Sequence, residues 1–272
     1  MAVKIQQLFP GLAYMPGETM VHRMHPLPKL LLLIVFSICV FAFSRISAAL
    51  LLFLLLLLGY ACSGLGPGFF VRKLRVILIF GLMMLLVQVI SVRQGHLLLE
   101  LVLLDTVQLQ VWTAGLAAGL LMMFRFVNII ASSYLFVSTT DPNKLVYALM
   151  QAGLPYRYGF MIITSLRFIP IFNREMAIIR NAQMAKGIDM EGISLPKVLR
   201  MTKYLLIPLV ICALNKVDYL AISMESRAFG LHPGRTYLFE QIATRKEWGF
   251  LALSTGLLLL GGMLLMGLGY PF

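Results

Sequence analysis

Residues 30–62 read "LLLLIVFSICVFAFSRISAALLLFLLLLLGYAC", two apolar runs with a single charged residue, Arg45, between them. About 20 apolar helical residues cross the hydrocarbon core of a bilayer, and only helices or closed barrels satisfy the backbone there. The apolar residues are continuous rather than alternating, which favours helices over a β-barrel. The stretch therefore predicts two consecutive spans, Leu30–Phe43 and Ile46–Cys62, in an all-α integral membrane protein.

The composition of the whole chain agrees with this prediction. Of 272 residues, 60% are hydrophobic and only 12% are charged, which is too little polar surface to coat a soluble globule. The net charge of +12 is expected from basic residues that gather in cytoplasmic loops, so nucleic acid is not an expected partner. The first 29 residues lack the apolar run of a signal peptide, so the first span is expected to direct insertion.

Three further apolar segments bring the predicted number of spans to five. Val76–Val92 follows a break at Gly64–Gly68 and a basic cluster at 72–75, and two others begin at tryptophans typical of an aromatic belt. These two spans are 112–137 and 248–268. The segment before the fourth span, residues 93–111, is poor in Lys and Arg, and we expect it outside the membrane, along the interface.

Residues 139–247 hold 14 of the 23 Lys and Arg residues, which indicates the cytoplasmic side. We expect three helices here, Pro142–Gln151, Tyr158–Lys186 and Leu195–Phe229. They are not expected to be further spans, because the apolar runs within them are short and interrupted by Pro170 or Pro208.

The predicted organisation has three parts. A lead-in with helices 1–4 occupies residues 1–138, a cytoplasmic domain of three helices occupies 139–247, and a final span occupies 248–272. With five spans and the N-terminus in the cytoplasm, we expect the C-terminus outside.

The two longest predicted helices end alike, with a cation between two small residues. The triplets are Ala185, Lys186 and Gly187 in the first, and Ser226, Arg227 and Ala228 in the second. Gln183, Glu225 and Gly230 are expected to support these ends. A basic last turn followed by Gly is also an ordinary helix stop. Finding the pattern at the ends of two oversized helices nevertheless predicts a docking device, because small neighbours let a helix end enter a groove closely.

Several stretches follow the order found in one transporter family. "MVHRMHPLPKLLLL" (Met20–Leu33) is similar to a His-Arg-x-x-Pro-x-x-Lys-Leu lead-in, and "SLRFIPIFNREMAIIRNAQMAKG" (Ser165–Gly187) to a Leu-Arg-Phe-x-Pro helix that runs into an Ala-Arg-Gly signature. "AISMESRAFG" (Ala221–Gly230) is similar to a second such signature. On these residues the chain resembles the transmembrane T component (EcfT or CbiQ-like) of energy-coupling factor (ECF) transporters.

The resemblance implies about five spans joined to long crossed coupling helices, whose ends insert into grooves on two ABC-type ATPases. A membrane-embedded substrate-binding S component would pack on these helices and on the bundle, and would receive the motion of the ATPases. Those ATPases would bind ATP and Mg, so no cofactor is expected on this chain. The S component would choose the substrate, a vitamin or a transition-metal ion such as cobalt or nickel. The resemblance also implies that the protein lies in a prokaryotic cell membrane.

The chain departs from the family pattern at two positions. Lys186 stands where Arg is usual, which keeps the charge but loses the bidentate fork of a guanidinium. Ala228 stands where Gly is usual, which predicts that the helix continues to Gly230.

Other residues carry weaker indications. Arg125, with Asn128, lies near the middle of the fourth span and could contact the S component, but we favour bundle packing, because intramembrane cations also pair with carbonyls. His22 and His25 have no accompanying carboxylate or cysteine, so no metal site is expected. The sequence has no P-loop and no evident nucleophile and base pair, so no enzyme is expected. The alternative is a self-contained secondary transporter or channel, which calls for polar residues through several spans or inverted repeats.

Overall fold

A computed structural model describes residues 14, 17, 19–64, 67–92, 94, 96–104, 107–188, 195–232 and 244–267. These residues divide into two compact units. The bundle unit contains the described residues of ranges 6–145 and 241–272, and the crossed-helix unit contains those of range 146–240.

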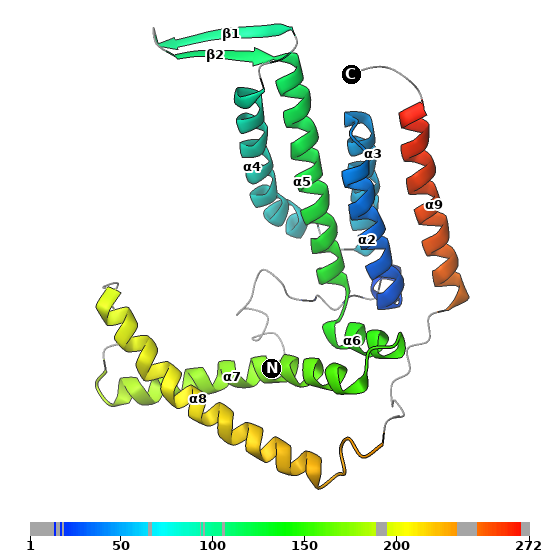
Figure 1. Ribbon diagram of the computed structural model, residues 1–272. Helices are drawn as coiled ribbons and strands as arrows, with labels where there is room; N and C mark the ends of the chain where they lie inside the picture. Colours follow the sequence, from blue (N-terminus) through cyan, green and yellow to red (C-terminus); the bar gives the residue numbers. More distant parts are fainter. Residues whose placement is uncertain are drawn as a thin grey trace. The chain divides into compact units, whose positions relative to one another are not determined.

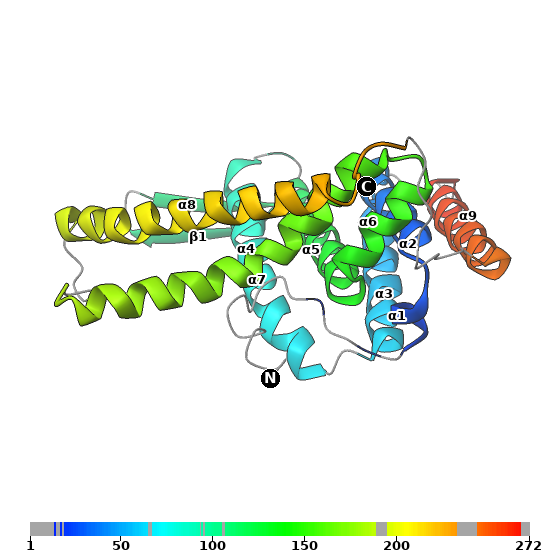
Figure 2. The same cartoon turned by 90° about the horizontal axis from the view of Figure 1, so that it is seen from below.

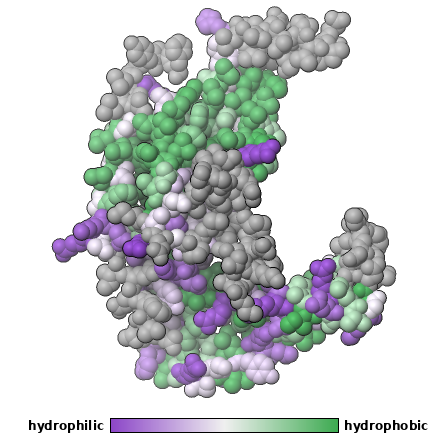
Figure 3. Space-filling model, turned by 180° about the vertical axis from the view of Figure 1, so that it is seen from behind, coloured by the Kyte–Doolittle hydropathy of each residue, from purple (hydrophilic) through white to green (hydrophobic). Residues whose placement is uncertain are grey.

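The bundle unit is built from helices that lie side by side (Figure 1). They are α1 (Met20–Arg23), α2 (Pro26–Ala42), α3 (Ile46–Ser63), α4 (Pro67–Ser91), α5 (Thr113–Thr139) and α9 (Arg245–Gly267). Helices α2, α3 and α5 share a core with α9, in which Val40, Leu52, Val127 and Leu258 are almost fully buried. On the face shown in Figure 3, the described surface of this unit is mainly hydrophobic.

Glu247 joins the starts of α9 and α2. One carboxylate oxygen accepts a hydrogen bond from the backbone N–H of His25 at 2.8 Å, and the other accepts one from the N–H of Thr244 at 2.8 Å. The second bond caps α9, because the first N–H groups of a helix have no partner within it. Further along these two helices, Phe43 packs directly on the backbone of Gly262, which leaves no room for a side chain there.

Helices α4 and α5 approach closely through glycines. A Cβ added at Gly115 would lie 2.8 Å from the carbonyl oxygen of Val92, and one at Gly119 would lie 3.0 Å from that of Leu85. Gly115 and Gly119 are four residues apart, the small-xxx-small spacing by which membrane helices pack backbone to backbone.

Three helical stretches are long and apolar enough to cross a membrane by length and composition within the described residues: Ile46–Ser63, Thr113–Thr139 and Met201–Glu225. Two shorter apolar helices, Pro26–Ala42 and Arg75–Ser91, accompany them. The predicted all-α membrane fold is confirmed for the bundle and the crossed helices, to which the two-stranded hairpin described below is an addition. The sequence analysis took the apolar runs within residues 139–247 as too short to span on their own. Met201–Glu225 is nevertheless long and apolar enough by length and composition, because the helix runs on through Pro208 to Glu225.

The start of α4 differs from the sequence-based prediction. α4 begins at Pro67, so the basic cluster at 72–75 lies inside the helix rather than in a loop before it. Proline suits the first helical position, where its missing N–H costs nothing.

A two-stranded antiparallel hairpin, β1 (Leu97–Leu104) and β2 (Val107–Trp112), connects α4 to α5 (Figure 1). The sequence analysis placed this segment outside the membrane without predicting strands. The alternation of apolar residues with Gln108 and Gln110 is the pattern that could have predicted them.

The crossed-helix unit contains α7 (Tyr156–Ala185) and α8 (Leu195–Glu225), preceded by the end of α6 (Pro142–Gln151). The bounds of α6 match the prediction. Met150 lies against the backbone of Gly159, so α6 packs closely on the start of α7. Helix α8 runs antiparallel to α7 and crosses it (Figure 1), which confirms the predicted long crossed helices.

Two polar interactions join α7 and α8. Lys216 Nζ donates to Glu175 Oε1 at 2.7 Å, and Gln183 Nε2 donates to the carbonyl oxygen of Tyr204 at 3.3 Å. The pairs come in antiparallel order, since Gln183 follows Glu175 on α7 while Tyr204 precedes Lys216 on α8, so they join the two helices at separate points along their length.

Candidate functional site: two helix ends

The end of α7 is closed by two backbone hydrogen bonds. The N–H of Ile188 donates to the carbonyl of Gln183 at 3.2 Å, and the N–H of Gly187 donates to that of Met184 at 3.0 Å. Gly187 has a φ of +78°, in the left-handed region. This is a Schellman motif, in which Lys186 is the C-cap and Gly187 reverses the chain.

The end of α8 has the same geometry. The N–H of Phe229 donates to the carbonyl of Met224 at 3.0 Å, and the N–H of Ala228 donates to that of Glu225 at 2.9 Å. Ala228 has a φ of +53° and takes the place that Gly187 takes in the first motif. The two triplets are therefore equivalent: a small residue in the last turn, a cation at the C-cap and a residue in the left-handed conformation.

The prediction that the helix continues to Gly230 is wrong. Helix α8 ends at Glu225, and Ala228 turns the chain although it carries a Cβ. The physical reason lies next to it, because the Phe229 ring packs against Phe160 with centroids 4.5 Å apart and against Tyr156 at 5.8 Å. These ring contacts hold the chain back over the start of α7 and offset the strain at Ala228.

A third motif of this kind ends α6 and serves as an internal comparison. The N–H groups of Leu154 and Gly153 donate to the carbonyls of Leu149 and Met150, and Gly153 has a φ of +120°. Its C-cap position is Ala152. A cation at the C-cap is thus not demanded by the backbone geometry.

Both cations are exposed, as are their small neighbours. Lys186 follows the end of α7 and Arg227 follows the end of α8, and the two lie at opposite ends of the antiparallel pair (Figures 1 and 2). A positive side chain is favourable at a helix C-terminus, where the last carbonyls point outward. Each end therefore presents an exposed cation that can donate charge-assisted hydrogen bonds to a partner.

The three supporting residues predicted from the sequence act through their backbone and through one side chain. The carbonyls of Gln183 and Glu225 accept bonds of the two Schellman motifs. The side chain of Gln183 also reaches α8, as described above. Gly230 has a φ of +93°, and its carbonyl accepts from Arg157 Nη2 at 3.5 Å. The sequence analysis missed Arg157 and the aromatic contacts of Phe229, because these pairs are more than 65 residues apart in the chain.

Arg125 and Asn128 lie in the bundle unit, on α5. Arg125 Nη2 donates to the carbonyls of Phe41 and Phe43 and to Ser44 Oγ, each at 3.3 Å, at the end of α2 and in the turn that follows it. Asn128 is fully buried, and its Nδ2 donates to the carbonyl of Ala49 on α3 at 3.0 Å. Both contacts connect α5 to its neighbours in the bundle, while a contact with an S component stays a prediction.

Within the described part of the chain, no group of three or more His, Cys, Asp or Glu side chains is placed to hold a metal ion.

Comparison with known proteins agrees with this arrangement. Residues 17–238 match the family model "Cobalt transport protein", CbiQ. The chain is 32% identical over 231 residues to an energy-coupling factor transporter transmembrane protein, EcfT, of Lactococcus lactis, covering 82% of this chain and 85% of that protein. The EcfT protein of Listeria innocua is 33% identical over the same shares, and that of Bacillus subtilis is 28% identical over 86% of this chain and 89% of its own length. The chain therefore belongs to the CbiQ family of prokaryotic membrane transport proteins, as an EcfT-like T component of an energy-coupling factor transporter.

Proposed function

We propose that this T component is a non-enzymatic coupling subunit, which passes ATP-driven motion from two ABC-type ATPases to a membrane-embedded S component. The observation that carries the proposal is the pair of equivalent, exposed helix ends with Lys186 or Arg227 at the C-cap. Each end would insert into a groove on one ATPase, where the cation pairs with a carboxylate or a backbone carbonyl.

The two ends would bind with different geometry. Arg227 offers a planar guanidinium that can donate two parallel hydrogen bonds, whereas Lys186 is a compact point charge on a flexible stem. Lys186 therefore suits a single acceptor, and the two ATPase grooves need not be identical. Ala185 and Ser226 are small and exposed, so either helix end can approach a groove wall closely.

The crossed pair is suited to transmit force. Helices of 30 and 31 residues are each about 45 Å long at 1.5 Å per residue. The Lys216–Glu175 ion pair, with side chains 32% and 25% exposed, joins them between the two ends. With the Gln183–Tyr204 contact, it would pass movement of either helix end to the other helix rather than let the two bend separately.

The S component would pack on the apolar surface of α8. Its large exposed side chains include Leu206, Ile207, Val210, Ile211 and Leu214. An apolar strip of this kind, unusual on a monomeric soluble surface, is typical of a partner or membrane contact. The S component would select the substrate, a vitamin or a transition-metal ion, and ATP and Mg would be bound by the ATPases alone.

The proposed topology places the N-terminus and the crossed-helix unit in the cytoplasm and the C-terminus outside, which keeps the predicted domain limits of 138 and 247. Because Met201–Glu225 could cross a bilayer by composition, the topology has a direct test. Single cysteines at exposed Tyr219 and Lys203 should react with an impermeant thiol reagent only from the cytoplasmic side. If neither cysteine reacts with the reagent added on either side, α8 lies in the membrane.

Charge reversal at both ends tests the coupling role. A double Lys186→Glu, Arg227→Glu variant should insert into the membrane normally, lose association with the ATPases and abolish uptake. The matched control is Arg174→Glu, an exposed cation on α7 about 18 Å before Lys186 at 1.5 Å per residue, which should leave association intact. Normal uptake by the double variant, or transport by the purified chain alone, would contradict the proposal.

A further inference from the structure

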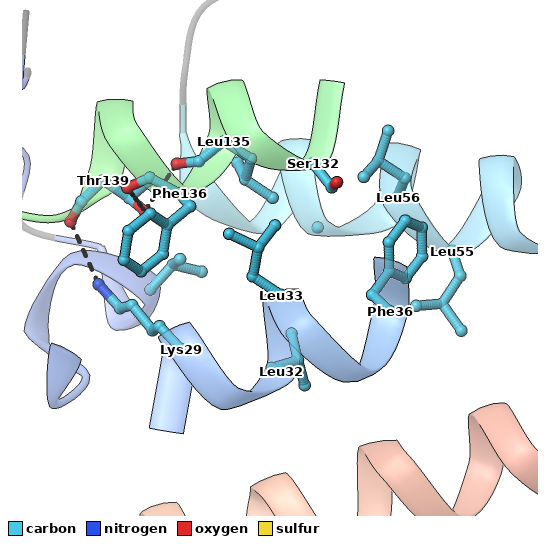
Figure 4. Close-up of a pocket in the computed structure, with 12 residues that line it drawn as sticks. Lys29, Leu32, Leu33, Phe36, Leu55, Leu56, Ser132, Leu135, Phe136 and Thr139 are labelled. Atoms are coloured by element: carbon cyan, nitrogen blue, oxygen red, sulfur yellow. Dashed lines mark hydrogen bonds between the residues drawn. The ribbon is translucent and has the colours of Figure 1, made fainter. Parts of the chain in front are cut away.

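A mostly apolar cavity of about 130 Å³ lies within the bundle unit, between α2, α3 and α5 (Figure 4). Its walls are formed mainly by Leu33, Phe36, Leu55, Leu56, Leu135 and Phe136. Leu33 and Phe136 point into it from facing helices, while Lys29 and Thr139 lie at one end (Figure 4). The coupling role proposed above does not use this cavity.

Lys29 is an unusual residue for such a place, because its side chain is only 8% exposed. Its Nζ donates to the carbonyl oxygen of Thr139 at 3.2 Å, which caps the C-terminal end of α5. An ammonium group has three N–H donors. Among the described residues, Thr139 provides the one protein acceptor for Lys29, so two donors are available to a ligand.

The charges around Lys29 leave this end of the cavity positive. Among the described residues, the charges of Lys144 and Glu247 act on the Lys29 ammonium. The Glu247 carboxylate is already engaged by the backbone N–H groups of His25 and Thr244. Lys144 adds a second positive charge, and its side chain is exposed. An anion at Lys29 would therefore be favoured over a neutral ligand.

We propose that this cavity binds an anionic membrane phospholipid. The phosphate accepts hydrogen bonds from Lys29, and the first methylenes of one acyl chain occupy the apolar part, while the remainder of the lipid stays in the bilayer. The size is suitable, since an apolar cavity of about 150 Å³ holds one benzene molecule, and about 130 Å³ therefore holds a chain segment of a few carbons. Basic pockets between membrane helices are typical binding places of anionic head groups.

The test uses the full-length chain purified in mild detergent. Thermal unfolding is followed in micelles that contain phosphatidylglycerol or phosphatidylcholine as the only phospholipid, and retained lipid is identified by native mass spectrometry. The wild type should be stabilised by phosphatidylglycerol only and should retain it. Lys29→Met, which keeps the length of the side chain without its charge, should lose both effects.

Two further variants separate the cavity from the charge. Ser132→Leu fills the cavity from α5 and leaves Lys29 in place, so it should also lose the preference for phosphatidylglycerol. Arg75→Met removes an exposed charge on α4 outside the cavity lining and should retain the preference. If Lys29→Met does not fold, the comparison of Ser132→Leu with the wild type decides. The proposal is overturned if Ser132→Leu or Lys29→Met keeps the preference, or if inorganic phosphate protects the wild type as well as the lipid does.

Discussion

Ala228 adopts a left-handed backbone conformation, which costs free energy for a residue with a Cβ. Exchanging Ala and Gly at this position of the two helix ends measures that cost. The left-handed conformation costs an L-residue about 1–2 kcal/mol. Glycine avoids this cost but loses about 0.4–1 kcal/mol through the greater freedom of the unfolded chain. Ala228→Gly should therefore stabilise the end of α8 by about 0.5–1 kcal/mol, and Gly187→Ala should destabilise the end of α7 by a similar amount.

Local hydrogen exchange is the suitable assay, because fraying of a helix end does not require global unfolding. The reporters are the amides of Phe229 and Ile188, which donate the longer-range bond of each Schellman motif. Since 1.4 kcal/mol corresponds to a factor of ten, exchange at Phe229 should slow by about two- to fivefold in Ala228→Gly. Exchange at Ile188 should accelerate by a similar factor in Gly187→Ala.

The design contains its own controls. A Cβ at Gly187 meets nothing within 4 Å, so Gly187→Ala changes only the backbone preference. Gly153→Ala at the end of α6 has the same open surroundings, with a φ of +120°, and should accelerate exchange at Leu154. Unchanged exchange in Gly187→Ala, or faster exchange at Phe229 in Ala228→Gly, would refute the assignment of both ends to one conformational motif.

Two other substitutions test how the helices are held together. Reversing either charge of the Lys216–Glu175 pair should weaken the contact between α7 and α8, and exchanging both charges should restore it. A double-mutant cycle of unfolding measurements should give a coupling energy of about 1 kcal/mol or less, because both side chains are partly exposed. Gly119→Val should push α5 away from the backbone of Leu85 and lower the free energy of unfolding in detergent by about 1–3 kcal/mol. Gly256→Val, whose Cβ would lie in open space, should have little effect. Equal losses of stability in both variants would contradict close packing at Gly119.

The positions of most helices could be predicted from the sequence, because their determinants are local. Apolar runs gave α2 and α3 within a few residues, and the Asp141–Pro142 start with a later Gly and Pro gave the bounds of α6. The start of α4 was less accurate, because Pro67 can either break a helix or begin one.

The hairpin and the glycine contact were missed although both leave a local pattern. β2 alternates apolar residues with Gln108 and Gln110, and Gly115 and Gly119 have the spacing of a close helix contact. The apolar character of both segments obscured these patterns, because continuous leucines and a small-residue stripe also occur in a helix that faces lipid.

The geometry of the helix ends could be predicted only in part. Gly187 indicates a left-handed C-cap, whereas Ala228 does not, because an Ala at that position adopts positive φ only when contacts elsewhere hold it there. Those contacts come from Phe160 and Tyr156, on another helix. The acceptors of Arg125 are likewise carbonyls at the end of α2 and in the turn that follows it, more than 80 residues away in the chain.

The Schellman geometry separates folding from recognition within each triplet. The third residue is constrained by its backbone, since Gly187 and Ala228 must both turn the chain with positive φ. The middle residue is not constrained in this way, because the equivalent motif of α6 has Ala152 at its C-cap and closes with the same two hydrogen bonds. A cation at both exposed C-caps of the crossed pair therefore calls for an explanation outside the fold of this chain. Substitution of Lys186 or Arg227 should accordingly affect what the helix ends bind much more than how they fold.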